Sequence, residues 1–280
     1  MDRRQSSTHD DGTTDDGNAR GQPRKRFGQN FLVDPSATRR IVAALAPRSG
    51  ETVLEIGPGR GALTEALLAA VPSLLAVEID RDLVRLLRGR FSEDRLRLIE
   101  HDVLDVRFAE LAPGPIVIAG NLPYYISKPV AMKLVTERRS VARAVLMFQR
   151  EVADRLTALP GTRAYGPLSI LCGRAYRIER LFDLSPGAFR PSPKVVSSVT
   201  LWTPRGDGSL DDALVAPLRL VLGAAFAHRR QTIQKNLRVA LPGGDVAART
   251  LLETTALDGR LRAEMIPPEG FVALARAWPH

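Results

Sequence analysis

Short apolar segments alternate with amphipathic segments from Glu51 onward, and this alternation limits the possible folds more than any other feature of the sequence. Strands are predicted at 52–56, 74–78, 96–100, 116–119 and 144–148, with two more near 177–184 and 196–203. Helices are predicted between the first two strands up to residue 70, over 81–90, and from Glu151. Strands that alternate with helices in this way are typical of an α/β fold with a parallel sheet.

The two ends of the chain differ from its central part. Residues 1–23 are polar, acidic between Asp10 and Asp16 and poor in apolar side chains, so a disordered tail is predicted there. The sequence PRGDGS at 204–209 is typical of a loop, and the residues after it show helical spacing with no strand-like run. We therefore expect a sheet domain over 24–205 and a small all-helical domain over 206–280.

The composition narrows the range of partners and compartments. The chain has 40 Lys and Arg against 31 Asp and Glu, a net charge of +9, and basic proteins favour nucleic acids or anionic membranes.

The longest uncharged stretch, 111–127, contains three prolines and two glycines, so no membrane span is predicted. The N-terminal residues form no apolar signal segment and Cys172 is the only cysteine, which favours a reducing cytoplasm. The four histidines are scattered, so no metal site is predicted.

A glycine-rich turn follows the first predicted strand of the sheet. Gly57, Gly59 and Gly61 allow a tight turn and a close approach of the backbone to a ligand, just before a helix N-terminus. The spacing differs from the G-x-G-x-x-G of dinucleotide folds, and no phosphate-loop lysine follows. The turn therefore favours a smaller nucleoside ligand that carries a carboxylate, although a plain strand–helix connector has the same composition.

Polar side chains stand at the ends of the next three predicted strands. Glu78 is placed to accept hydrogen bonds from the two hydroxyls of a ribose, and Asp102 from an adenine amino group. Asn121 follows the fourth strand. Each acid alone could be a solvated loop charge, but the carboxyl ends of strands are where open α/β sheets bind ligands. The ordered series therefore predicts one nucleoside site.

The segment Asn121-Leu122-Pro123-Tyr124 has the composition of a site that methylates a planar amine. The lone pair of adenine N6 is delocalised into the ring, so the nitrogen is a poor nucleophile. The side-chain oxygen of Asn121 and the carbonyl of Leu122, held by Pro123, can accept hydrogen bonds from the amine and turn its lone pair outward. Tyr124 offers a face for base stacking. A simple turn remains the alternative interpretation.

Four segments together resemble the ribosomal RNA adenine N6-dimethyltransferases, most closely those that modify bacterial small-subunit (16S) rRNA. The segments are RFGQNFL at 26–32, EIGPGRG at 55–61, NLPYYIS at 121–127 and FRPSPKV at 189–195. The resemblance implies a Rossmann-like, S-adenosylmethionine-dependent methyltransferase domain and a helical RNA-binding domain. It further implies a monomer that dimethylates N6 of two adjacent adenines in the 3′-terminal hairpin of the rRNA, within the immature 30S subunit.

The resemblance also assigns roles to individual residues. The implied cofactor contacts are Asn30, Leu32, Gly57 at the methionine part, Glu78 at the ribose, Asp102 at the adenine and Asn121 at the sulfonium. The implied catalytic group comprises Asn121, Leu122, Pro123, Tyr124 and Phe189, whose ring would stack on a flipped base opposite Tyr124. The chain departs from the family pattern at Tyr125, where asparagine is common, and at Ser192 and Val196.

The segment AFAHRRQTIQKNL at 225–237 resembles a basic helical segment of the same family. As one helix it would place Leu222, Phe226, Ile233 and Leu237 on one face. RNA contacts are predicted at Arg229, Arg230, Lys235 and Arg238, with a solvated polar face as the alternative.

The sequence is also compatible with two other functions. A large-subunit (23S) rRNA adenine methyltransferase of the macrolide-resistance kind would share the cofactor motifs. A ribosome-assembly or transcription factor could keep the fold without catalysis, although the intact 55–61 and 121–124 segments favour an enzyme.

Overall fold

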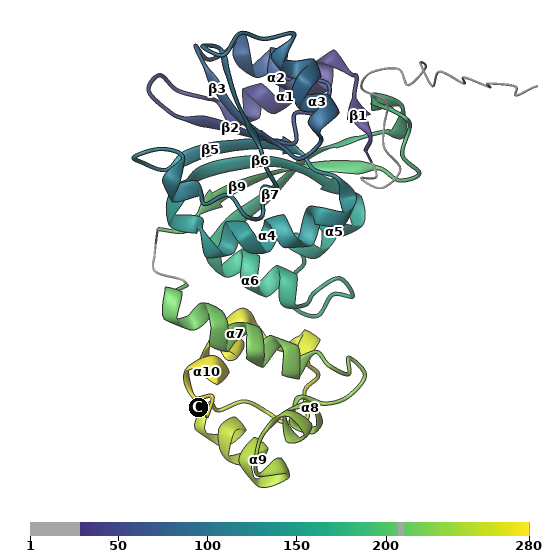
Figure 1. Cartoon of the computed structure of the whole chain (residues 1–280). Helices are drawn as coiled ribbons and strands as arrows, with labels where there is room; N and C mark the ends of the chain where they lie inside the picture. The colour runs from purple at the N-terminus through teal and green to yellow at the C-terminus, as the bar shows by residue number, and fades with distance from the viewer. Residues whose placement is uncertain (1–28, 207–209, 280) are drawn as a thin grey trace, which may run out of the picture.

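The computed structural model describes residues 29–206 and 210–279, so the whole tail predicted over 1–23 and the Arg26–Gly28 part of the first motif lie outside the described residues. The part of the chain that is described has a sheet flanked by helices and, at its other end, a group of helices (Figure 1). The α/β fold class predicted from the sequence is confirmed.

The main sheet has seven strands in the order β4-β3-β2-β5-β6-β9-β7. Their bounds are β2 Val53–Ile56, β3 Leu74–Glu78, β4 Leu96–Glu100, β5 Ile116–Asn121, β6 Val141–Gln149, β7 Tyr176–Leu184 and β9 Ser197–Pro204. Neighbours from β4 to β6 pair in parallel, whereas β9 pairs antiparallel with both β6 and β7. The strands predicted at 74–78 and 96–100 are confirmed to the residue.

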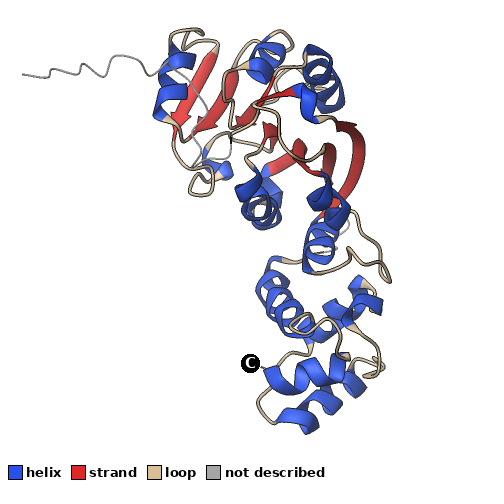
Figure 2. Ribbon diagram, turned by 90° about the vertical axis from the view of Figure 1, so that its right-hand side faces the viewer, coloured by secondary structure: helices blue, strands red, loops and turns tan. Residues whose placement is uncertain are grey.

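Helices cover both faces of the sheet, as its two buried faces require (Figure 2). On one face lie α1 Pro35–Leu45, α2 Ala62–Leu68 and α3 Arg81–Arg88, and on the other α4 Ser127–Thr136, α5 Arg150–Leu156 and α6 Pro167–Ala175. Successive strand residues alternate between the two cores: Val53 packs with α1 and α2, and Leu54 with the opposite cluster. Short 3₁₀ turns lie at Phe108–Glu110, Tyr124–Ile126, Arg138–Ser140, Pro186–Ala188 and Ala263–Met265.

The described residues after Pro204 form helices, with one isolated bridge between Thr232 and Arg262. The helices are α7 Asp212–Ala225, α8 Ile233–Ala240, α9 Gly244–Thr254 and α10 Pro268–Arg276. They share one hydrophobic cluster with the α4–α6 side of the sheet. The Tyr165 hydroxyl donates to the Ile266 carbonyl at 3.0 Å across this junction. The division at 206 stays a prediction, because the two parts are packed into a single core.

The segment 222–238 does not form one helix, so the arrangement considered for a single helix does not apply. Helix α7 ends at Ala225, turns occupy 226–232, and α8 begins at Ile233 after Thr232, whose hydroxyl accepts from the Lys235 amide. The side chain of Asn236 holds the turn in place, because its amide donates to the carbonyls of Ala225 and His228. The turn satisfies backbone groups that a continuous helix would have bonded internally.

A short second sheet lies beside the main one. A two-residue strand β1 (Phe31–Leu32) pairs antiparallel with β8 (Phe189–Arg190) and so joins two distant segments of the chain. Cys172 and Trp202 are fully buried in the core, as expected for packing residues. Among the described helices, none has the length and apolar character needed to cross a membrane.

Candidate active site

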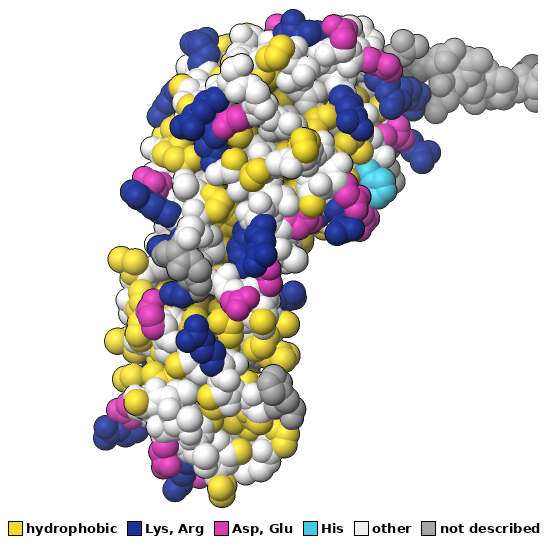
Figure 3. Space-filling model, turned by 90° about the vertical axis from the view of Figure 1, so that its left-hand side faces the viewer, with side chains coloured by type: hydrophobic (Ala, Val, Ile, Leu, Met, Phe, Trp, Pro, Cys, Tyr) yellow, Lys and Arg dark blue, Asp and Glu magenta, His cyan; other side chains and the backbone are white. Residues whose placement is uncertain are grey.

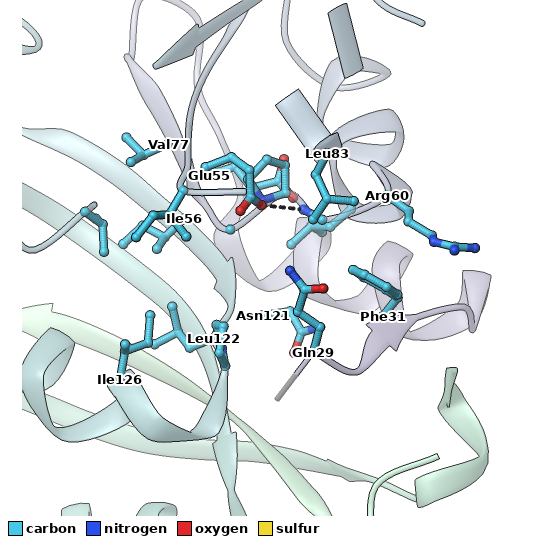
Figure 4. A pocket seen from close by; sticks show the side chains of 18 of the residues that line it. Gln29, Phe31, Glu55, Ile56, Arg60, Val77, Leu83, Asn121, Leu122 and Ile126 are labelled. Carbon is cyan, nitrogen blue, oxygen red and sulfur yellow. Dashed lines mark hydrogen bonds between the residues drawn. The ribbon is translucent and has the colours of Figure 1, made fainter. Parts of the chain in front are cut away.

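A cavity lies at the carboxyl ends of β2, β3 and β5 and extends to the residues after β4 (Figure 4). The space between its walls, counted together with the open solvent at its mouth, is about 950 Å³. The predicted residues that line it are Asn30, Leu32, Gly57, Glu78, Asp102, Asn121, Leu122, Pro123 and Tyr124. The strand order of the main sheet and the N-terminal segment together bring every residue of the expected cofactor group to the cavity, whereas Phe189 does not line it.

The glycine-rich turn forms one wall of this cavity. Gly57, Gly59 and Gly61 have φ values of +66°, +59° and +84°, a region that residues with a Cβ rarely adopt. At Gly59 a Cβ would also come within 3.0 Å of the Phe31 ring. The amide of Gly59 instead donates to the Glu78 carboxylate at 3.2 Å, so the turn fixes the acid across from it.

Glu78 is buried and held in one orientation. One carboxylate oxygen accepts from Gly59, and the other accepts from the Asp80 amide at 2.9 Å. Burial raises the pKa of Glu78, while these backbone hydrogen bonds act in the opposite direction. Asp102 is half-buried, and its carboxylate accepts from the Leu104 amide at 2.9 Å. The two acids line the same side of the cavity, at the ends of adjacent strands.

Glu55 is a cavity residue whose role was not predicted from the sequence. Its side chain is 1% exposed and accepts from the Thr64 hydroxyl at 2.6 Å. Burial raises the pKa of Glu55 to about 8, opposed by the Thr64 hydrogen bond and assisted by the charge of Glu78. A charged residue inside the otherwise apolar strand Val53–Ile56 was the signal that could have identified it.

The raised pKa of Glu55 makes stability depend on pH. Between about pH 4.5 and 8 the folded protein retains a proton that the unfolded chain has lost, so this contribution falls as the pH rises through that window. We expect Glu55→Gln to increase the free energy of unfolding at pH 8.5, by on the order of 1–3 kcal/mol, and to have a smaller effect at pH 5. Urea unfolding at the two pH values measures the difference.

Glu51→Gln is the matched control, because its shift has the opposite sign. The Arg143 guanidinium donates to both carboxylate oxygens and lowers the pKa of Glu51 to about 2. Its contribution is complete above the unfolded value of 4.5, so this variant should lose stability equally at pH 5 and pH 8.5. Equal effects of Glu55→Gln at the two pH values would exclude a raised Glu55 pKa.

Asn121 is oriented by the N-terminal segment. Its side-chain nitrogen donates to the Asn30 carbonyl at 3.0 Å, so the donor end of the amide already has a partner within the protein. Within residues 29–206 and 210–279, no donor is bonded to its side-chain oxygen. The acceptor end of Asn121 therefore remains available at the cavity, which is the end that an amine substrate needs.

Tyr124 is also held in place. Its hydroxyl and that of Ser197, at the start of β9, lie 3.1 Å apart in a hydrogen bond. Tyr124 is half-buried, so part of its ring stays accessible at the cavity, while Ser197 is fully buried. The bond ties the NLPYYIS segment to the strand that follows FRPSPKV.

The structure shows Phe189 buried and not as an open surface opposite Tyr124, so its stacking on a target base stays a prediction. The Phe189 side chain is 1% exposed and packs in the core on the α1–α3 face. Its backbone pairs with Leu32 in the β1–β8 ladder. The apolar ring is more stable in this core than in an open cavity.

The predicted RNA-contacting residues lie in the helical part, away from the cavity residues. Lys235 and Arg238 are exposed on α8, and Arg230 is exposed in the preceding turn. Arg229 differs, because its guanidinium donates to the carbonyls of Arg163 and Tyr165 at 2.9 and 3.1 Å. Figure 3 shows basic side chains spread over both parts of one face of the molecule.

The mostly parallel sheet, the glycine-rich turn and the acid-lined cavity together define a Rossmann-like fold with a site suited to a nucleoside cofactor. Asp and Glu at the nucleoside end, with backbone amides at the turn, fit such a cofactor. In the described part of the chain, no three His, Cys, Asp or Glu side chains are grouped as metal ligands.

The family model for ribosomal RNA adenine dimethylase matches residues 20–275, and the chain belongs to this family. Ribosomal RNA small subunit methyltransferase A from Acidithiobacillus ferrooxidans is 41% identical over 261 residues, 92% of this chain and 96% of that protein. The protein of the same name from Aromatoleum aromaticum is 43% identical over 254 residues, 90% and 92% of the two chains. The family resemblance expected from the four motifs is thus confirmed.

Solved structures support the same fold. A dimethyladenosine transferase from Plasmodium falciparum superposes with a TM-score of 0.75 at 24% identity, covering 87% of this chain and 95% of that one. The 23S rRNA methyltransferase ErmE superposes with a TM-score of 0.67 at 24% identity, covering 89% and 99%.

Proposed function

We propose that this enzyme transfers methyl groups from S-adenosylmethionine to N6 of two adjacent adenines in the 3′-terminal hairpin of small-subunit rRNA. The observation that carries the proposal is the orientation of Asn121, whose donor end is bonded to Asn30 while its acceptor end stays free at the cavity. An acceptor at this position suits an amine, and the acids on the opposite side suit a nucleoside cofactor.

One group of residues would bind the cofactor, and a second group would bind the target amine. When bound in the cavity, S-adenosylmethionine would supply a methyl group carried by its sulfonium sulfur, which is a good leaving group. Glu78 would bind its ribose hydroxyls, Asp102 its adenine, and Gly57, Asn30 and Leu32 its methionine end. Asn121 and the Leu122 carbonyl would accept hydrogen bonds from the target amine and direct its lone pair to the methyl carbon. The nitrogen becomes positively charged and acidic as the N–C bond forms and can pass its proton to water, so no strong base is needed.

The small-subunit substrate is favoured over 23S rRNA by the relatives of this chain. Those that are 41–43% identical over nearly the whole chain carry a small-subunit name, whereas ErmE shares 24% identity. We infer that the enzyme acts as a monomer on the immature 30S subunit in the cytoplasm. The Arg and Lys excess of the chain suits that partner.

The deciding experiment supplies methyl-labelled S-adenosylmethionine with either unmethylated small subunits or naked large-subunit rRNA. We expect label on two adjacent adenines of the small-subunit hairpin, mapped by mass spectrometry of nuclease fragments. Label on large-subunit rRNA alone would establish the alternative substrate. Absence of label from both RNAs would contradict the proposed activity.

Helix α8 should hold the RNA backbone. Lys235 and Arg238 are both exposed on this helix, so Lys235→Gln with Arg238→Gln removes two charges without disturbing its buried face. We expect weaker binding to small subunits and a log–log salt slope that is shallower by about 0.7–0.9 for each lost phosphate contact. Filter binding across a salt series measures both quantities.

The matched control removes two exposed arginines at the amino ends of the strands, opposite the cavity. Arg48→Gln with Arg97→Gln makes the same change in net charge. This control should leave affinity and slope close to those of the unmodified protein. Equal slopes for the unmodified protein and the α8 variant would show that α8 does not contact phosphates.

A further inference from the structure

Tyr125 is the one position of the NLPYYIS segment where the chain departs from the asparagine common in the family. Its side chain is 54% exposed and lines the cavity next to Tyr124. Its hydroxyl has no hydrogen-bond partner among the residues that the structure describes. A large aromatic ring left open at the mouth of a binding cavity is typical of a surface that a ligand covers.

The two tyrosines face different parts of the cavity. They are consecutive in the 3₁₀ turn Tyr124–Ile126, where successive side chains point about 120° apart. Tyr124 is fixed toward β9 by the hydrogen bond to Ser197. Tyr125 lines the cavity together with Glu78 and Asp102. Burial raises the pKa of its phenol, and the carboxylates of Asp102 and Glu78 raise it further.

We propose that Tyr125 is a further cofactor-binding residue, whose ring covers the adenosine half of the bound cofactor at the cavity mouth. The inference rests on the proposed function, since it assumes that Glu78 and Asp102 bind the ribose and adenine. A flat ring beside those two acids can stack on the purine and exclude water from the hydrogen bonds that the acids make. Asparagine has no such face. This chain should therefore bind both the cofactor and the demethylated product more tightly than the same chain with asparagine at position 125.

Calorimetry on the full chain without RNA tests the proposal, with S-adenosylmethionine and S-adenosylhomocysteine as the two titrants. Tyr125→Asn should weaken binding of both ligands by about 5- to 100-fold, the range expected for loss of one stacked ring. Tyr125→Phe should remain within about 2-fold of the unmodified protein, because it keeps the ring. Leu159→Asn is the matched control: it removes an apolar side chain that is 70% exposed and does not line the cavity.

The outcomes separate the two proposals. If the unmodified protein binds both ligands and the Tyr125→Asn variant binds them with the same affinity, the role of Tyr125 is overturned and the proposed function stays intact. Unmodified protein that binds neither ligand overturns the proposed function and this inference with it. A Tyr125→Phe variant as weak as Tyr125→Asn would assign the effect to the hydroxyl and overturn stacking. Equal urea midpoints of the variants establish that the fold is unchanged.

Discussion

Replacing Asn121 by alanine is expected to lower turnover by about 100-fold or more while leaving cofactor affinity largely unchanged. In the proposed mechanism the Asn121 side-chain oxygen accepts from the target amine, and the side-chain nitrogen is already bonded to Asn30. Its hydrogen bond to the amine should strengthen as the nitrogen becomes tetrahedral, so its loss affects the transition state more than the bound substrates. Single-turnover methylation of unmethylated small subunits measures the chemical step directly.

Asn121→Asp separates orientation from hydrogen-bond acceptance. It keeps an acceptor at the cavity but places a carboxylate oxygen against the Asn30 carbonyl, where the native amide donates at 3.0 Å. We expect Asn121→Asp to be slow as well, because two acceptors repel and the side chain loses its fixed position. An alanine variant with near-normal turnover would remove Asn121 from catalysis. Calorimetry of cofactor binding to both variants shows whether the cavity is intact.

Much of the site could be predicted from the sequence because its residues lie at the carboxyl ends of strands. Glu78 closes a strand whose five residues are all buried, and a buried strand that ends on an acid is a local pattern. Parallel neighbours then bring their carboxyl ends to one edge, so Asp102 and Asn121 join Glu78 without any further information. Glu55 was missed because its importance comes from complete burial, which depends on the packing around the strand.

The turn between α7 and α8 could not be predicted from apolar spacing alone. Leu222, Ile233 and Leu237 are all buried, as a continuous helix would require, yet they belong to two helices. The break depends on the Asn236 side chain, which bonds to carbonyls eight and eleven residues earlier in the sequence. Thr232 was the one local signal, since threonine is a favoured N-cap residue.

Phe189→Ala is expected to destabilise the protein by about 3–5 kcal/mol, the usual cost of removing a fully buried phenylalanine ring. The ring fills the core on the α1–α3 face, and its backbone holds Leu32 through the β1–β8 pair. That pair joins segments more than 150 residues apart, which explains why the sequence indicated an aromatic residue in a family motif but not its burial. Urea unfolding of the unmodified protein and the variant measures the loss.

Phe189→Leu distinguishes a packing ring from one that stacks on the target base. Leucine fills much of the same apolar space, so the leucine variant should recover most of the stability lost in Phe189→Ala. If the ring acts by packing, methylation by the leucine variant should follow its stability and approach the rate of the unmodified protein. A leucine variant that is stable but as slow as the alanine variant would contradict this, because leucine offers no face worth the 1–3 kcal/mol of base stacking. That result would mean that Phe189, buried here at 1% exposure, leaves the core when RNA binds and meets the adenine opposite Tyr124.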